Sequence, residues 1–220
     1  MEIPLSDIRQ GCAMLIQRIR RHASDAMVLL QTGAGHDQGA LILMLIGFEE
    51  LGKLLEYIQE AAKAEHSSKN MVSVRDYRDP EFRRNVHTLK AELTSDYFRR
   101  ALHLVDSAMQ AAGAAGLELG PYSDHLSAIG ADFRRTRRHA MYLDFENGIW
   151  TSGKPVDTGT LTTDIFGLLV GAGLIEAAME GQTTFVGVVN KSVEGEKNLQ
   201  DLVKEVIRAI LQSGFKPSER

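Results

Sequence analysis

A long apolar segment, residues 37–62, carries a cluster of charges near its middle. The nine residues 40–48 are all nonpolar, and Glu49, Glu50 and Lys53 follow within about one helical turn. The apolar side chains recur every three or four residues, which predicts an amphipathic helix. Burying ionised groups is costly unless they are paired. We therefore expect these charges either to pair with neighbouring helices or to line a polar site.

The composition is that of an ordinary globular protein. The chain has 220 residues, of which 44% are hydrophobic and 25% charged, and its formal net charge is −4. This length suits one domain, or one domain with an appendage. The negative net charge gives no general affinity for nucleic acid, so such a role requires a local basic patch. The single cysteine, Cys12, excludes an intrachain disulfide framework, fits a reducing cytosol and is expected in the core.

The sequence predicts a cytoplasmic protein with no membrane partner. The first residues have neither the basic nor the apolar region of a secretory signal. The most apolar stretch, residues 165–178, contains Glu176 and three glycines. We expect this stretch to be too short to span a bilayer.

Helix signals mark the first two thirds of the chain. Ser6 is a suitable cap for a first helix that runs to about residue 32, and a polar loop is expected over residues 66–79. Asp79-Pro80 predicts the start of a long third helix, to about residue 112. Ser123 is placed to cap a fourth helix, to about residue 141, and Asn147-Gly148 favours a turn before loop-like residues 150–160.

The last third has a different pattern. Thr163 or Asp164 is expected to cap a glycine-spaced apolar helix that ends near residue 179. The β-branched residues 183–189 favour a short strand or an extended segment, and residues 196–211 a final amphipathic helix. The sum is an all-α protein: an up-and-down four-helix bundle over residues 1–160, with a helical C-terminal extension, residues 161–220, packed on the same domain.

Two groups of charged residues on predicted helices have alternative interpretations. Glu49 and Lys53 are four residues apart, which suits a structural salt bridge at the edge of the core or an acid-base site facing another helix. His87 and Lys90 are three residues apart beside the apolar stripe of the third helix. They are either packed or solvated side chains, or a pair that binds an anion or shares a proton with Glu50.

A basic run, residues 134–139, is the best local candidate for binding phosphate. It holds four arginines and one histidine, and Arg134, Arg138 and Tyr142 follow one row of the helix. A solvated basic surface is the alternative. Arg138 is also placed to pair with Glu49 or Glu50 across the bundle.

Arg134 and His139 have the Arg-x4-His spacing that HEPN ribonucleases use. In that arrangement the arginine would hold the scissile phosphate and the histidine would transfer a proton at the ribose 2′-hydroxyl. Such spacing also arises by chance in a basic helix. No Glu-x-x-His pair of the di-iron bundles occurs, and no phosphate-binding glycine loop, so we expect neither a metal nor a cofactor.

Three short motifs together resemble the AbiV-type abortive infection family, which belongs to the broader HEPN group. They are Phe-Glu-Glu-Leu-Gly-Lys at 48–53, His87-x-x-Lys90, and Arg138-x-x-x-Tyr-Leu-Asp-Phe ending at Phe145. The resemblance covers roughly residues 10–160. It implies a HEPN-like helical bundle that forms a homodimer and acts in the bacterial cytoplasm as an antiphage protein that blocks translation. His139 departs from it, because a small residue is expected at that position.

Carried onto this sequence, the resemblance implies a functional cluster of Glu49, Glu50, Lys53, His87, Lys90, Arg138, Tyr142 and Asp144. Our leading hypothesis is an effector that binds or cleaves RNA without a metal and is activated by a phage protein. His87 would transfer the proton, Glu50 would orient His87 or Lys53, and Lys53 and Arg138 would complete the catalytic set. Lys90, Arg134, His139 and Tyr142 would bind RNA phosphate, and Glu49 and Asp144 would form a structural polar network.

Two alternatives remain open from the sequence. The same polar residues would fix helix register in a non-catalytic helical binding module that docks a phage or ribosome-associated protein. A nucleotide-binding regulator that uses the basic helix is the third reading.

Overall fold

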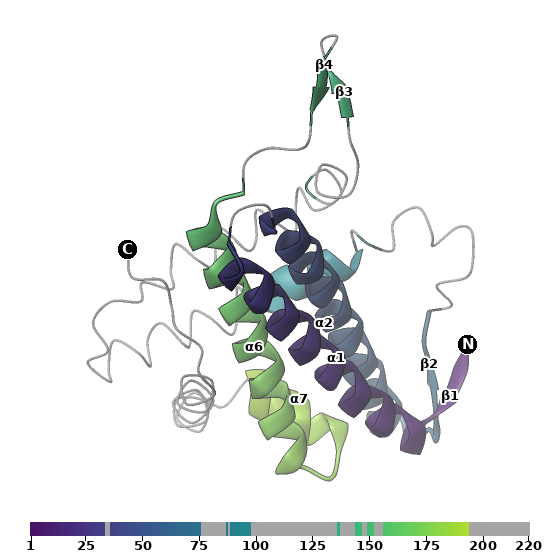
Figure 1. Cartoon of the computed structure of the whole chain (residues 1–220). Helices are drawn as coiled ribbons and strands as arrows, with labels where there is room; N and C mark the ends of the chain where they lie inside the picture. The colour runs from purple at the N-terminus through teal and green to yellow at the C-terminus, as the bar shows by residue number, and fades with distance from the viewer. Residues whose placement is uncertain are drawn as a thin grey trace.

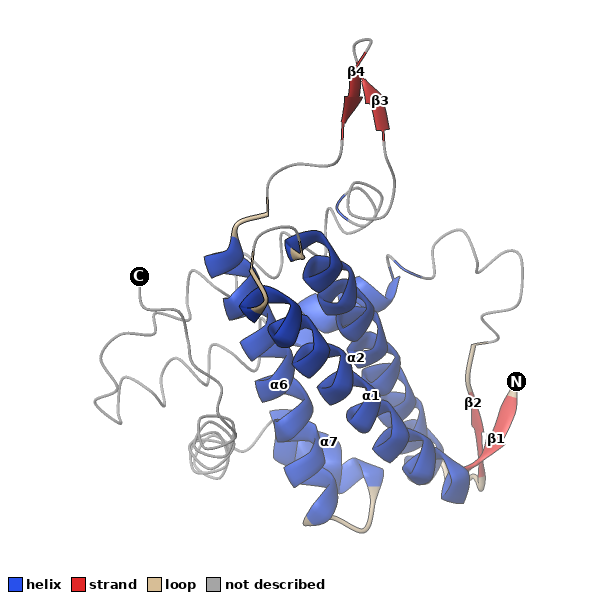
Figure 2. Ribbon diagram, in the orientation of Figure 1, coloured by secondary structure: helices blue, strands red, loops and turns tan. Residues whose placement is uncertain are grey.

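Helices dominate the structure of this protein. The computed structural model describes residues 1–33, 36–75, 87, 89–97, 136, 144–146, 149–151 and 156–193. Long helices lie side by side in this part of the chain, and the strands are short (Figures 1 and 2). The prediction of a mainly helical protein is therefore confirmed.

Helices α1 (Leu5–Gln31) and α2 (Asp37–His66) form the first hairpin. The apolar spacing in α1 has the predicted effect, because one stripe of the helix is buried: Ile8, Cys12, Leu15, Ile16, Ile19, Ala23 and Ala26. The prediction that Ser6 caps α1 is wrong. The helix begins at Leu5, the N-cap position is Pro4, and the Ser6 hydroxyl lies 3.0 Å from the Asp7 carboxylate.

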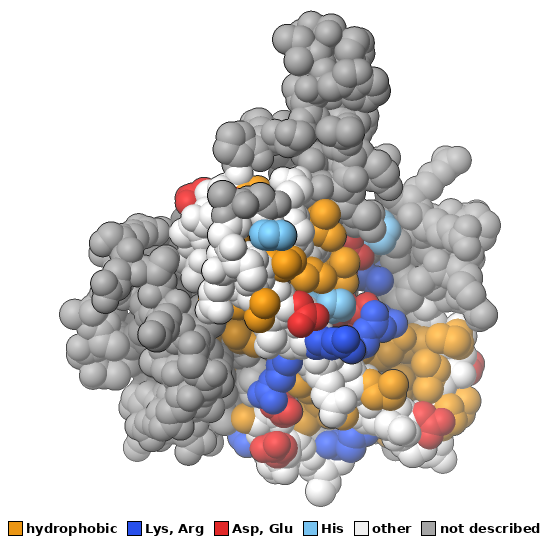
Figure 3. Space-filling view, in the orientation of Figure 1, with side chains coloured by type: hydrophobic (Ala, Val, Ile, Leu, Met, Phe, Trp, Pro, Cys, Tyr) orange, Lys and Arg blue, Asp and Glu red, His pale blue; other side chains and the backbone are white. Residues whose placement is uncertain are grey.

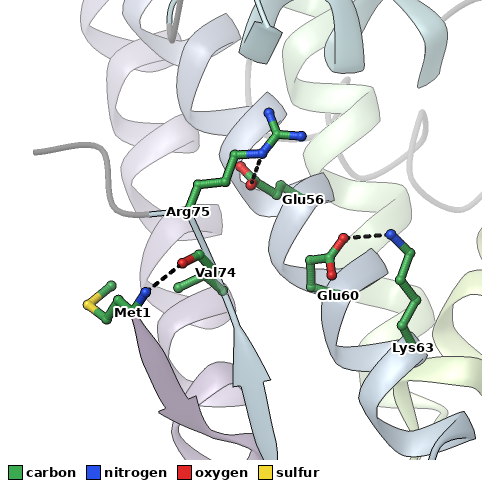
Figure 4. Close-up of polar contacts among 6 residues, drawn as sticks. All are labelled: Met1, Glu56, Glu60, Lys63, Val74 and Arg75. Atoms are coloured by element: carbon green, nitrogen blue, oxygen red, sulfur yellow. Dashed lines mark hydrogen bonds and ion pairs between the residues drawn. The ribbon is translucent and has the colours of Figure 1, made fainter. Parts of the chain in front are cut away.

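Two short strands that the sequence did not reveal join the N-terminus to the segment after α2. Strand β1 (Glu2–Pro4) pairs antiparallel with β2 (Met71–Ser73), and Ile3 lies opposite the buried Val72. The terminal amine of Met1 donates to the Val74 carbonyl at 3.0 Å (Figure 4). The expected polar loop over 66–79 therefore contains a strand, because its few apolar residues pair with the N-terminus.

Helix α6 (Thr158–Glu180) packs against α1 and α2 and belongs to the core. It begins before the predicted caps: the Asp157 side chain accepts a hydrogen bond from the Gly159 amide at 3.1 Å, and Asp164 is buried inside the helix. The predictions of Thr163 or Asp164 as the cap are therefore wrong, because Asp157 takes that role. Glu176 of α6 forms an ion pair with Arg20 of α1.

The expectation that this apolar stretch is too short for a membrane is also wrong. Helix α6 has 23 residues and is long and apolar enough to span a bilayer, but 78% of its most apolar window is buried within the protein. Such burial is typical of the core helix of a globular protein. It is the burial of α6, and not its length, that supports a core role.

Residues 185–193 form a helix and not the predicted strand. Helix α7 (Phe185–Val193) packs on α2 and α6 and buries Phe185 and Val188. The Val186 amide donates to the Glu65 carboxylate of α2 at 3.0 Å, and the Gly187 amide to the Thr184 hydroxyl at 3.1 Å. These two acceptors satisfy amides of the first turn, which stabilises a helix despite the β-branched composition.

A small hairpin stands apart from the helices (Figure 1). Strand β3 (Asp144–Glu146) pairs antiparallel with β4 (Ile149–Thr151), so the predicted turn at Asn147-Gly148 falls between the strands. The start of the predicted loop 150–160 is therefore a strand, and its end is part of α6. The predicted helices over 79–112, 123–141 and 196–211 lie mostly outside the described residues, although 87, 89–97 and 136 are helical.

The domain division at residue 160 stays a prediction, and so does the four-helix bundle. Helix α6 crosses this position. The buried core of the described part is shared by α1, α2, α6 and α7, with Phe48 of α2 and Phe185 of α7 among its largest fully buried side chains.

Candidate functional site

A short polar contact between distant segments joins two of the predicted site residues. Nδ1 of His87 lies 2.6 Å from Oε2 of Glu49 on α2. An ionised carboxylate only accepts hydrogen bonds, so Nδ1 carries the hydrogen and donates it. In the neutral imidazole, the other ring nitrogen, Nε2, is then left to accept a proton. The Glu49 side chain is 12% exposed and that of His87 39%, so the carboxylate is shielded while the imidazole is open to a ligand.

The helical segment 89–97 crosses α2 beside this pair. The Thr94 hydroxyl donates to the Phe48 carbonyl of α2 at 2.9 Å, and a Cβ atom placed on Gly52 would overlap the backbone carbonyl of Lys90. The two backbones therefore touch where glycine has no side chain. This crossing brings the segment's polar residues to the charged turn of α2.

Lys90 lies among the charges of α2. Burial lowers the pKa of the Lys90 ammonium, the nearby Glu49 carboxylate opposes this shift, and the Lys53 ammonium adds to it. Lys53 also lies above the ring of Tyr57, with its Nζ atom 5.6 Å from the ring centroid. Two ammonium groups and one imidazole thus lie near the shielded carboxylate of Glu49, and the carboxylates of Glu50 and Glu56 also act on Lys90. This combination suits an anionic ligand whose reaction needs proton transfer.

The second carboxylate of α2, Glu50, turns to α1. Its Oε1 atom lies 3.3 Å from the guanidinium of Arg18. Its Oε2 atom and Nε2 of His22 are buried and have no hydrogen-bond partner within the described residues. Burial lowers the pKa of His22, and the Arg18 charge lowers it further, while Glu50 acts in the opposite direction. The predicted orienting residue is Glu50, but the carboxylate that contacts His87 is that of Glu49.

A third polar contact lies one to two turns further along α2. Glu56 is only 6% exposed, and its Oε1 atom lies 3.3 Å from Nε of Arg75, which reaches over from the end of β2 (Figure 4). A buried carboxylate with a guanidinium partner is a structural ion pair. It holds the segment after β2 against α2.

The face of the described part that Figure 3 shows carries charges of both signs. Figure 3 shows basic, acidic and histidine side chains close together there, with hydrophobic side chains exposed beside them.

Burial raises the pKa of the Cys12 thiol to about 12, so this cysteine is an unreactive core residue, as expected. No group of three or more His, Cys, Asp or Glu residues that could hold a metal occurs in the described part of the chain.

The structure brings together five of the predicted site residues: Glu49, Glu50, Lys53, His87 and Lys90. Asp144 lies in β3, and the other four, Arg134, Arg138, His139 and Tyr142, lie outside the described residues. Sequence reasoning missed Gly52 and Thr94, which form the crossing, and Arg18, which pairs with Glu50. A glycine in the middle of an apolar helix was the one available signal of a close backbone approach.

Comparison with known proteins gives no relative. No protein-family profile, no curated protein and no solved structure matches this sequence. The class of protein is thus described by its own fold and site: a mainly helical protein with a carboxylate–imidazole pair beside two lysines.

Proposed function

We propose that this protein is an antiphage abortive-infection effector of the AbiV type that cleaves RNA in the bacterial cytoplasm. The observation that carries the proposal is the 2.6 Å contact between Glu49 and His87, with Lys90 and Lys53 beside it. A carboxylate that fixes an imidazole is a recurrent arrangement for a general base. Lysines next to that base supply positive charge for a phosphodiester.

The chemistry of the pair suits attack by a ribose 2′-hydroxyl. Glu49 holds the hydrogen on Nδ1 of His87, so Nε2 takes the 2′-hydroxyl proton while the 2′-oxygen bonds to phosphorus. The bond from phosphorus to the 5′-oxygen breaks, and that oxygen takes up a proton from solvent. The products are a 2′,3′-cyclic phosphate and a 5′-hydroxyl. Lys53 and Lys90 stabilise the charge that builds up on the phosphoryl oxygens, so the proposal requires no metal or cofactor.

The remaining predicted residues extend the RNA-binding surface in this proposal. Arg134, Arg138, His139 and Tyr142 would hold further phosphates, and Asp144 would pair with one of the arginines. A HEPN-like bundle, a homodimer with opposed polar faces and activation by a phage protein complete the proposal, and they rest on the resemblance in residues 48–53, 87–90 and 138–145.

An RNA cleavage assay without added metal tests this function. Wild-type protein is incubated with total RNA and with tRNA, in the presence and absence of phage lysate, and the new ends are mapped. We expect cyclic-phosphate ends with wild type and their loss in His87→Ala. His66→Ala is the matched control, because His66 is an exposed histidine in the last turn of α2. Loss of cleavage in both variants would argue against a specific role of His87.

A non-catalytic binding module is the second candidate. The pairs Arg18–Glu50 and Arg75–Glu56 tie the charges of α2 to other elements, as in a network that fixes helix register. This function predicts no RNA cleavage under any condition, and a protein partner recovered with wild type and His87→Ala alike. In that case the partner would be a phage or ribosome-associated protein.

A further inference from the structure

The Thr94 hydroxyl links the two elements that carry the candidate site. Thr94 is fully buried, and its Oγ1 atom lies 2.9 Å from the Phe48 carbonyl oxygen of α2 and 3.1 Å from the Lys90 carbonyl oxygen of its own segment. The single hydroxyl hydrogen is therefore shared between two acceptors, the Phe48 carbonyl on α2 and the Lys90 carbonyl on the crossing segment. A buried contact of this kind is specific in direction as well as distance.

Gly52 provides the second fixed point of the same crossing. It follows Phe48 by four residues, so both lie on one face of α2. Any side chain at Gly52 would collide with the Lys90 backbone. The Thr94 hydroxyl fixes the position of the segment 89–97 along the axis of α2. Gly52 allows the short distance between the two backbones.

The side chains of Glu49 and His87 are attached close to these two fixed points. Glu49 directly follows Phe48, and His87 precedes Lys90 by three residues. A shift of one residue along a helix is about 1.5 Å. A shift of this size along the direction of the contact would stretch the 2.6 Å distance between His87 and Glu49 beyond hydrogen-bonding distance.

We propose that Thr94 is a positioning residue, whose hydroxyl holds the register in which Glu49 fixes the imidazole of His87. The consequence for catalysis rests on the proposed function, whereas the consequence for the imidazole does not. Without the hydroxyl, the hydrogen bond from Thr94 to α2 is lost and His87 loses its fixed tautomer.

The test measures the tautomer of His87 by 15N NMR of histidine-labelled protein, at about pH 8, where imidazole is ordinarily neutral. His87→Gln assigns the signal. Thr94→Val removes the hydroxyl and keeps the shape, while Thr94→Ser keeps the hydroxyl. Thr162→Val is the matched control, because the Thr162 hydroxyl also donates to a backbone carbonyl, that of Thr158 at 2.7 Å, within α6.

We expect wild type, Thr94→Ser and Thr162→Val to show the Nδ1–H tautomer as the major form. In Thr94→Val the Nε2–H form, which free imidazole favours, should become the major one. An unchanged tautomer in Thr94→Val would overturn the inference. So would an equal shift in Thr94→Ser, because this would assign the effect to the methyl group. If Thr94→Val does not fold, Thr94→Ala takes its place, because alanine also lacks the hydroxyl, and an unchanged tautomer in it would overturn the inference.

A kinetic measurement separates this inference from the proposed function. If wild type cleaves RNA, Thr94→Val should lower kcat/KM by on the order of 100-fold, because the base is misplaced and Lys90 moves with the same segment. If wild type does not cleave RNA, the proposed function fails and the NMR result still decides the role of Thr94. Cleaving wild type with an unchanged tautomer in Thr94→Val would overturn this inference alone.

Discussion

Glu49 and Glu50 are adjacent on α2, yet their carboxylates bond to different elements. Oε2 of Glu49 lies 2.6 Å from the imidazole of His87, and Oε1 of Glu50 lies 3.3 Å from the guanidinium of Arg18 on α1. Successive side chains of a helix point about 100° apart, so neighbouring residues face different partners. One carboxylate therefore contacts the candidate base, and the other belongs to the α1–α2 contact.

This difference predicts unequal effects of two matched substitutions. Glu49→Gln should lower RNA cleavage by about 10–100-fold, because the amide no longer holds the His87 hydrogen as a carboxylate does. Glu50→Gln should leave cleavage nearly unchanged and cost at most about 1 kcal/mol of stability, because Arg18 is 58% exposed. Initial rates of RNA cleavage and urea unfolding of both variants measure the changes in activity and stability. Equal losses of activity would contradict separate roles.

The stability of the protein should depend on the protonation of His22. Burial first, and then Arg18, lower the pKa of His22 below its ordinary value of 6.5; Arg21 adds to this, while Glu50 and Asp25 oppose it. Between the lowered folded pKa and the unfolded one, the unfolded chain binds more protons, so stability falls as the pH decreases below about 6.5.

Urea unfolding between about pH 8 and pH 5 measures this dependence on His22. We expect His22→Gln to show a smaller loss of stability at acid pH than wild type. His36→Gln serves as the control, because His36 is an exposed histidine at the N-cap of α2. The same slope in wild type and His22→Gln would show that other groups cause the acid sensitivity.

Arg9 should stabilise the turn between α6 and α7. Its guanidinium donates to the carbonyls of Met179 at 3.3 Å and Thr183 at 3.0 Å, and lies 5.1 Å from the ring centroid of Phe185. Arg9→Ala should cost about 1–2 kcal/mol, because two carbonyls lose a charged donor. Chemical denaturation should show little change for Arg21→Ala, whose contact with Asp25 is exposed and 3.8 Å long.

Two glycines in helices should respond in opposite ways to alanine. A Cβ atom at Gly11 in α1 would meet no atom within 4 Å, so Gly11→Ala should stabilise the protein by roughly 0.5–1 kcal/mol through helix propensity. Gly52→Ala should destabilise it, because the methyl group collides with the Lys90 backbone. Thermal melting compares the two variants. A stable Gly52→Ala protein with unchanged His87 signals would contradict the close crossing.

Helix α6 should behave as a core helix although its composition suits a membrane span. Leu168 is fully buried in α6, so Leu168→Ala should cost about 2–5 kcal/mol in urea unfolding. The wild-type protein should remain in the supernatant after high-speed centrifugation of a detergent-free lysate. Recovery in the membrane fraction would show that α6 leaves the core to enter a bilayer.

Local patterns predicted some elements well and others poorly. The apolar spacing of residues 37–62 predicted α2, because a buried stripe every three or four residues is a property of the segment itself. The segment 183–189 misled the prediction. Its β-branched residues favour a strand, but Glu65 of α2 accepts the Val186 amide and stabilises the first turn of α7. That acceptor is 121 residues away in sequence, so no local pattern contains it.

The candidate site also combines relations that the sequence predicts with relations that only the packing of helices sets. The sequence by itself determined that Glu49, Glu50 and Lys53 lie within one turn of an apolar helix, and that His87 and Lys90 share a helical face, because these relations follow from spacing alone. Only the tertiary structure decided that Glu49, and not Glu50, meets His87. The register of that contact is set where Thr94 bonds to Phe48, 46 residues away, and where Gly52 admits the Lys90 backbone. Helix crossings depend on packing between distant residues, which the spacing within one helix does not specify.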